Sequence, residues 1–346
     1  MPSPTSPRAR HLAAIAGAAL VAASCAPAGP PFRTFSGEAM ATRWEIVLPE
    51  RADAAAAAAR GFARLEELDL LLSEWKPSSP LSAINRAAGV EPVAVPEELY
   101  RLLERALELG RRTDGAFDVS WAALWGLWDF RAAAPELPDP GTLAARARLV
   151  DYRAVRLDAA RRTVFLPRAG MKLGLGGIGK GYALDAVAAL LEADGFGDFL
   201  LVGGGQVVAR GTRAGRPGRV GLRDPRGGRG EYFARVPLGD ASLSTTADNE
   251  SFFEIDGVRF HHVLDPRTGW PSRGLRSASV LHPDATLADA LSTAVMVLGR
   301  ERGFALAREL GAEVATVDVA GALEASAGLA ARWQLLRLPR RGPGPP

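Results

Sequence analysis

The chain has 346 residues, of which 47% are hydrophobic and 23% charged, with 42 Lys and Arg against 39 Asp and Glu. This length suits one large domain or two average ones, and the composition excludes a mostly disordered chain. The single cysteine excludes an internal disulfide framework and a cysteine-cluster metal site. No dense basic run interleaves with aromatic residues, so the sequence predicts no nucleic-acid partner.

Residues 1–24 have the pattern of an export signal. Arg8 and Arg10 precede the apolar run 12–23, which is too short for an ordinary membrane-spanning helix. Small residues then lead to Cys25, as in a bacterial lipobox, although Ala22 stands where leucine is usual. The sequence predicts a lipidated Cys25 and an exported lipoprotein anchored to a bacterial membrane, facing the periplasm or the cell exterior. A plain secreted protein is the alternative.

The rest of the chain predicts one domain between two flanking segments. Residues 25–34 are predicted to form a tether, because small residues and proline dominate their first part. Residues 35–330 form the predicted domain. Residues 331–346 form the predicted C-terminal tail, which ends in a stretch rich in Pro, Gly and Arg.

Helices and strands follow one another irregularly along the predicted domain. In chain order, residue patterns predict a strand within 35–48, helices over 52–75 and 96–112, a buried helix over 117–130, a hairpin over 155–166, a helix over 182–193, strands near 199–202, 207–209, 219–222, 232–236, 259–264 and 277–281, helices over 284–298 and 300–310, and a strand over 313–319. The order has no regular β-α-β repeat, so it predicts an α+β fold with mixed sheets and packed helices.

A glycine-rich turn at residues 175–182 is the first candidate for chemistry. Glycines before a helix let backbone N–H groups face a phosphate. The turn is not a P-loop, because no Ser or Thr follows Lys180. Lys180 itself predicts a phosphate contact, and the alternative is a simple strand-to-helix turn.

Asp289 and Thr293 form the second candidate. They are four residues apart and share one face of a predicted helix. A carboxylate and a hydroxyl in this arrangement suit Mg²⁺. The alternative is an acid that only complements the dipole of the first helical turn.

Two adjacent histidines, His261 and His262, form the third candidate. Side chains alternate along a strand, so at most one of the two can face a site. The stretch Asp265–Gly269 that follows predicts a turn.

In this order the motifs resemble the FAD:protein FMN transferases, also called ApbE-type flavin transferases. The resemblance runs from about Phe35 to about Leu329, and its most specific motifs are 262–269 and 288–294. It implies a T-fold-like ApbE-type architecture. It also implies a Mg²⁺-dependent transferase that moves FMN from FAD to a threonine or serine hydroxyl of an exported target flavoprotein and releases AMP.

The resemblance implies roles for individual residues. Asp289 and Thr293 would hold Mg²⁺ through their side chains, and Gly177 and Ser292 mainly through backbone oxygens. His262 would lie near the reacting phosphate as the first candidate for the base, with Asp265 as the alternative, and Lys180 would stabilise the leaving AMP. The FAD site would be lined by Met40, Trp75, Ala116, Phe117, Asp118, Gly174, Lys180 and Val263.

Two positions depart from the family pattern. Gly174 stands where the family usually has aspartate, and Ala41 stands where it usually has glycine. We expect Gly174→Asp to tighten FAD binding by restoring a charged contact. The alternative functions are a Mg²⁺-dependent FAD pyrophosphatase, which would give FMN and AMP, and a non-catalytic flavin-binding lipoprotein.

Overall fold

The computed structural model describes residues 30–213, 215–228 and 230–341. The predicted signal, Cys25 and most of the predicted tether lie outside these residues. Within the described ranges, no helix combines the length and the apolar character needed to cross a membrane.

The described residues form both helices and strands, which confirms the predicted α+β class. The helices are α1 (Ala54–Leu72), α2 (Pro80–Arg86), α3 (Glu97–Arg112), α4 (Pro140–Ala147), α5 (Gly179–Ala193), α6 (Ala285–Glu309) and α7 (Ala327–Ala330). The strands are β1 (Phe32–Ala39), β2 (Thr42–Pro49), β3 (Val93–Ala94), β4 (Arg156–Asp158), β5 (Thr163–Phe165), β6 (Phe199–Gly203), β7 (Gln206–Arg210), β8 (Gly218–Arg223), β9 (Tyr232–Leu238), β10 (Ala241–Ala247), β11 (Phe252–Ile255), β12 (Val258–His261), β13 (Leu275–His282), β14 (Glu313–Asp318), β15 (Leu323–Ala325) and β16 (Gln334–Leu335).

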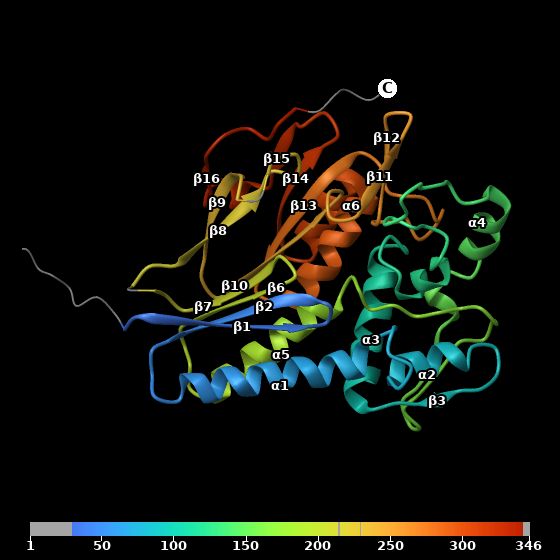
Figure 1. Cartoon of the computed structure of the whole chain (residues 1–346), viewed down its shortest axis with the longest axis horizontal. Helices are drawn as coiled ribbons and strands as arrows, with labels where there is room; N and C mark the ends of the chain where they lie inside the picture. Colours follow the sequence, from blue (N-terminus) through green and yellow to red (C-terminus); the bar gives the residue numbers. More distant parts are fainter. Residues whose placement is uncertain (1–29, 214, 229, 342–346) are drawn as a thin grey trace, which may run out of the picture.

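An antiparallel sheet of eight strands, in the order β1-β2-β6-β7-β10-β13-β14-β15, forms the centre of the fold (Figure 1). Helix α5 packs against both α1 and α6, and all three helices pack against one face of this sheet. The small sheet β16-β9-β8 covers hydrophobic side chains of the other face. Alternation along β7 shows why both layers form, because Val208 joins the helical core while Val207 and Ala209 join the core under the small sheet.

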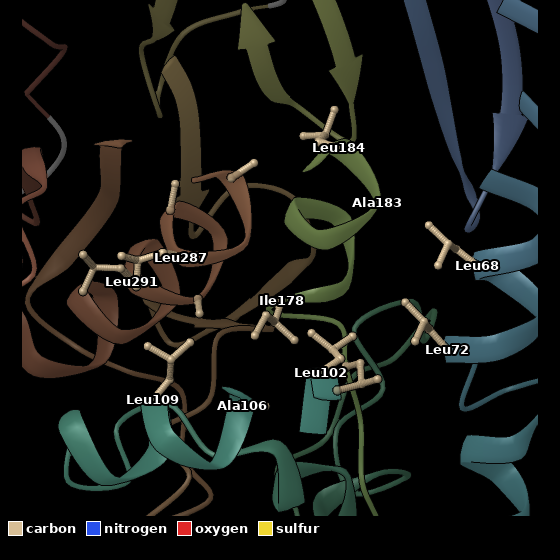
Figure 2. Close-up of a cluster of buried hydrophobic side chains, with 14 of the residues drawn as sticks. Leu68, Leu72, Leu102, Ala106, Leu109, Ile178, Ala183, Leu184, Leu287 and Leu291 are labelled. Carbon is tan, nitrogen blue, oxygen red and sulfur yellow. The ribbon is translucent and has the colours of Figure 1, made fainter. Parts of the chain in front are cut away.

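The helical core joins elements that are far apart in the sequence. Figure 2 shows leucines of α1, α3 and α6 in one buried cluster with Ile178 and Leu184, which lie at the start of α5. Leu287 and Leu291 lie four residues apart on α6 and are buried in this cluster. The cluster therefore fixes the first turns of α5 and α6, which contain the predicted phosphate and metal residues.

Several predicted elements need correction. The first strand is a hairpin, β1 and β2, with Met40 and Ala41 in its turn. The predicted buried helix 117–130 is only a short 3₁₀-helix, Val119–Leu124, because its tryptophans lie in three different environments and not on one helical face. The break predicted near residue 299, in contrast, is confirmed, because Gly299 has φ 77° and interrupts α6 with a kink.

The predicted flanking segments also contact the domain. Residues 32–34 of the predicted tether belong to β1 and pair with β2. Part of the predicted tail forms β16, which pairs with β9, and the backbone N–H of Arg340 donates to the Asp224 carboxylate at 3.1 Å. The domain's contacts therefore extend past the boundary that the composition suggested.

Candidate active site

A cleft of about 440 Å³ lies where the turn of the β1–β2 hairpin, the glycine-rich turn, β10 and α6 meet. It gathers most of the predicted site residues from segments spread over the whole domain. Its lining residues are Met40, Ala41, Thr42, Ala116, Phe117, Asp118, Trp121, Gly176, Gly177, Lys180, Gly204, Gln206, Thr245, Thr246, Ala247, Glu250, His262, Val263, Leu264, Pro266, Asp289 and Thr293.

A close crossing of α5 and α6 positions the acid of this cleft. A Cβ atom on Gly181 would lie 2.2 Å from the Ala285 carbonyl oxygen and 2.7 Å from Asp289 Cβ, so only glycine permits this approach. The Gly181 N–H donates to Asp289 Oδ2 at 2.9 Å. Asp185 of α5 accepts the N–H groups of Ala285 and Thr286 at 2.9 and 2.8 Å and so fixes the start of α6.

Asp289 is a buried carboxylate, 3% exposed, at the wall of the cleft. Burial raises its pKa, because desolvation disfavours the charged form, while the charge of Lys180 acts in the opposite direction. Asp289 makes no ion pair with any lysine or arginine of the described residues. A cation in the cleft would therefore stabilise its charged form.

The oxygen atoms around Asp289 fit a hard cation. Thr293 Oγ1 lies 3.4 Å from both the Asp289 carbonyl oxygen and Thr246 Oγ1, and a Cβ atom on Gly177 would lie 3.4 Å from it. Carboxylate, hydroxyl and backbone oxygens are the ligands that Mg²⁺ prefers. Among the described residues, no group of three or more His, Cys, Asp or Glu side chains gathers to hold a metal ion, so a cation beside Asp289 would need hydroxyl and backbone oxygens as its other ligands.

Ser292 has a different position from Thr293. It is fully buried, and its Oγ contacts Thr246 Oγ1 at 2.7 Å, the Asp289 carbonyl oxygen at 2.9 Å and Ser244 Oγ at 3.2 Å. These bonds join α6 to β10. Because its hydroxyl is used within the protein, Ser292 supports the cleft and does not line it.

The two histidines face opposite sides, as strand alternation predicted. His261 is buried, and its Nε2 bonds the Ser272 carbonyl oxygen at 2.9 Å; burial lowers its pKa to about 4. His262 reaches into the cleft, and its Nδ1 lies 3.3 Å from the Ser251 carbonyl oxygen. A carbonyl can only accept, so this bond requires the proton on Nδ1 and leaves the Nε2 lone pair free. Although the His262 ring meets solvent in the cleft, the surrounding walls partly desolvate it and lower its pKa.

Lys180 lies in the first turn of α5, and its Nζ donates to the Gly176 carbonyl oxygen at 3.0 Å. It lines this cleft and also a second, adjoining cleft of about 390 Å³. Met40, Ala41 and Gly176 line both clefts as well. The junction of the two clefts therefore carries a cation and a helix N-terminus, both of which favour phosphate.

The other predicted FAD-site residues divide into two groups. Ala116, Phe117, Asp118 and Val263 line the first cleft with Met40, and Trp75 lines the second. The Asp118 carboxylate is directed into the protein, since it accepts from Ser120 N at 2.7 Å, Ser120 Oγ at 2.6 Å and Tyr152 N at 2.9 Å. Burial raises its pKa. Asp118 therefore shapes the wall of the cleft more than it offers a free charge.

Besides Ser292, two more predicted residues, Asp265 and Gly174, line neither cleft. Asp265 binds its own turn, with its Oδ2 2.7 Å from the Arg267 guanidinium and its carbonyl accepting from Gly269 N at 2.8 Å. The Gly174 carbonyl oxygen accepts from Trp121 Nε1 at 3.1 Å. A Cβ atom on Gly174 would lie 3.0 Å from Ala122 Cβ and 3.1 Å from Trp121 Nε1. The Trp121 indole occupies the space that an aspartate side chain would need, which removes the physical basis of tighter binding in Gly174→Asp.

Several lining residues were not predicted. Thr245 and Thr246 come from β10, a strand that the sequence reading missed, although its run of hydroxyl residues could have indicated it. Gln206 is 3% exposed, and its Oε1 has no hydrogen-bond partner among the described residues. Trp121 was predicted only as a residue of the buried helix 117–130, and not as part of the site.

The fold and the site define a class of protein: an α+β domain with two adjoining clefts, which present a lysine, the N-terminus of α5 and a buried carboxylate. The sequence profile of the ApbE family matches residues 40–317, and the chain belongs to that family. This confirms the family that the motifs predicted.

Relatives of known type support this membership. The chain is 38% identical over 291 residues to the FAD:protein FMN transferase of Treponema pallidum, which covers 80% of each chain. It is 32% identical to the FAD:protein FMN transferase of Klebsiella pneumoniae, over 87% of this chain and 90% of the relative. The crystal structure of the ApbE protein from Thermotoga maritima matches with a TM-score of 0.80 and 30% identity, over 87% of this chain and 99% of that chain. The predicted enzyme class, a transferase, agrees with these names.

Proposed function

We propose that this chain is an FAD:protein FMN transferase that requires Mg²⁺ and acts on a threonine or serine hydroxyl of an exported protein. The observation that carries the proposal is the convergence of Asp289, Thr293, Lys180 and His262 on one cleft. The family and the names of its relatives support the same activity.

The proposed reaction is a phosphoryl-group substitution. The acceptor hydroxyl oxygen bonds the phosphorus of the FMN half of FAD, the bond from that phosphorus to the bridging oxygen breaks, and AMP leaves with that oxygen. The proton of the hydroxyl goes to a base. His262 Nε2 is free to take it, and its lowered pKa keeps the imidazole neutral near pH 7. Lys180, at the junction of the clefts, would stabilise the charge on the departing phosphate.

Asp289 and Thr293 would hold Mg²⁺, with backbone oxygens of the Gly177 turn beside them. When bound, Mg²⁺ would neutralise charge on the pyrophosphate and polarise it toward attack. Gly181 holds Asp289 in place through its N–H, and Ser292 holds α6 against β10. These contacts preorganise the oxygens before any ligand arrives.

The test is incubation of the purified chain with FAD, Mg²⁺ and an exported acceptor protein. We expect covalent flavin on the acceptor and an equal amount of AMP. Free FMN with an unmodified acceptor would support the pyrophosphatase alternative, and unchanged FAD would contradict both enzymatic functions.

We further propose that the chain is exported and anchored through lipid on Cys25. The support is the sequence pattern of residues 1–25. Because one acyl chain gives only marginal binding, stable anchoring needs more than one chain on this cysteine. Cys25→Ser should move the protein from the membrane to the soluble fraction without changing the activity of the domain. A variant that stays in the membrane fraction would contradict the lipid anchor.

A further inference from the structure

Exposed arginines gather on the loop between β7 and β8 and on the outer face of the small sheet. Arg213 and Arg216 lie in the loop, and Arg219 and Arg235 lie on β8 and β9. Side chains alternate along a strand, and Gly221 pairs with Arg235, so Arg219 and Arg235 share one face of the sheet. The opposite face carries the hydrophobic side chains that cover the central sheet, so this arginine patch faces solvent.

The positive charges of the arginine patch are not balanced nearby. None of the four arginines forms a salt bridge with a carboxylate of the described residues. Two carboxylates beside the loop are occupied by its backbone, since Asp240 accepts the Gly211 N–H at 2.9 Å and Asp198 accepts the Thr212 N–H at 2.6 Å. The formal net charge of the whole chain is only +3, so the patch is a local concentration of charge.

A tyrosine lies among these arginines. A Cβ atom on Gly221 would lie 2.4 Å from the Tyr232 ring, which places this ring on the same face as Arg219 and Arg235. Tyr232 is 41% exposed. Tyrosine is amphipathic and is enriched at the level of lipid headgroups, so its presence in a basic face fits a membrane surface.

The domain begins beside the arginine patch. The Arg213 guanidinium lies 5.2 Å from the ring centre of Phe32, the first residue of β1. Figure 1 shows the start of β1 next to the loop that joins β7 and β8. Cys25 precedes Phe32 by seven residues, and an extended chain spans at most about 3.6 Å per residue. Lipid on Cys25 would therefore keep Phe32 within about 25 Å of a membrane surface.

We propose that the arginine patch docks the domain on an anionic lipid bilayer. The inference rests on the proposed lipid anchor, which would hold the patch at high local concentration beside the headgroups. Guanidinium groups suit phosphate headgroups, because they donate two parallel hydrogen bonds to one phosphate. Each arginine near an anionic surface adds only about fivefold to the affinity, so the patch orients an anchored domain and does not hold the chain by itself.

Docking in this orientation leaves the active-site clefts accessible. Strand β1 runs from Phe32, beside the patch, to Ala39, which precedes Met40 and Ala41 in the wall of both clefts. These eight residues span about 24 Å, at roughly 3.4 Å per step. The clefts therefore lie at the far end of β1 from the docked face, where an exported acceptor can reach them.

The test is cosedimentation of the mature chain, residues 25–346 with Cys25→Ser, with vesicles. This chain contains every described residue and carries no lipid. The vesicles contain phosphatidylcholine with about one third phosphatidylglycerol, in a buffer of about 20 mM salt. Changing Arg213→Gln, Arg216→Gln and Arg219→Gln together should weaken binding about 100-fold. Vesicles of phosphatidylcholine alone should bind neither form, and salt should weaken the binding of the unchanged patch.

A second triple variant is the matched control. Arg131→Gln, Arg302→Gln and Arg308→Gln also remove three exposed arginines that form no salt bridge with the described residues, but they lie outside the patch. This variant should bind within about twofold of the parent chain, because its changed charges lie away from the docked face. Equal losses in the two triple variants would show an effect of net charge alone and would overturn the proposal.

A parent chain that binds neutral and anionic vesicles equally, or binds neither, would also overturn the docking surface. These outcomes do not depend on the lipid anchor, because Cys25→Ser removes the lipidation site from every chain compared. Membrane fractionation of the exported chain tests the anchor separately, and the acceptor assay tests flavin transfer.

Discussion

Replacing Asp289 by asparagine should make the protein more stable while removing its cation site. Asp289 is 3% exposed and its pKa is raised by burial, so the folded state binds a proton more tightly than the unfolded state does. Stability therefore falls as pH rises from the ordinary carboxyl range through the raised native pKa. Asparagine does not ionise, so the variant avoids this loss of stability, and its side-chain oxygen can still accept from the Gly181 N–H.

The size of the effect follows from two opposing contributions. A hydrogen bond to a charged group contributes about 1.5–3 kcal/mol and a neutral one about 0.5–1.5 kcal/mol, so about 1 kcal/mol is lost. The desolvation of a buried charge costs several kcal/mol, of which the charge of Lys180 offsets a part. We expect a net gain of about 1–2 kcal/mol in the free energy of unfolding, or a rise of about 2–6 °C in melting temperature.

Thermal unfolding at pH 7.5, with and without Mg²⁺, measures both effects. Wild type should gain stability from Mg²⁺, by about 2.7 kcal/mol at one hundred times the dissociation constant, and Asp289→Asn should gain almost none. At pH 4 the difference in unfolding free energy between Asp289→Asn and wild type should largely disappear. A variant that is less stable than wild type and keeps the full Mg²⁺ response would refute the assignment of Asp289.

Three further substitutions test the cleft. His262→Asn should lower the turnover rate about 100-fold or more and remove the acid limb of the pH profile, which in wild type should lie below the ordinary histidine range because the His262 pKa is lowered. Ala41→Gly should raise the unfolding free energy by about 0.5–1 kcal/mol, since Ala41 has φ 55° in the β1–β2 turn and glycine relieves that strain at some loss of chain entropy. Gly174→Asp should destabilise the fold by about 1–3 kcal/mol and weaken FAD binding, because the new side chain meets Trp121.

Matched variants control these comparisons. His282→Asn changes a histidine outside both clefts and should leave the turnover rate unchanged. Adding Trp121→Val to Gly174→Asp should recover most of the lost stability, and failure to do so would show that the indole is not the obstacle. An Ala41→Gly variant that unfolds at a lower temperature than wild type would contradict the strain argument.

The sequence predicted those parts of the fold that depend on local pattern. Helices α1, α3 and α5 follow from leucines and alanines at helical spacing, and the break near Gly299 follows from glycine. The tryptophans of 117–130 misled the prediction because spacing alone does not reveal partners. Trp121 bonds the Gly174 carbonyl, Trp125 stacks on Trp75 and Trp128 packs against Phe260, so tertiary contacts overrode the helical period.

Site residues could be predicted from the sequence where the residues that act together lie within one short motif. Asp289 with Thr293, and one of two adjacent histidines, follow from helical and strand geometry. Thr246, Gln206 and Glu74 were not found, because each becomes part of a cleft only through contacts with distant segments. The obstacle at Gly174 was equally hidden, since it depends on a residue 53 positions away in the sequence.

Intact-mass spectrometry of an acceptor protein tests the central claim most directly. The acceptor is incubated with the chain, FAD and Mg²⁺, beside the same acceptor with its threonine changed to alanine. We predict a mass increase equal to FMN minus water on the threonine form only, together with one AMP for each acceptor modified. An unmodified threonine acceptor, with FAD either intact or hydrolysed to free FMN, would contradict the transferase assignment.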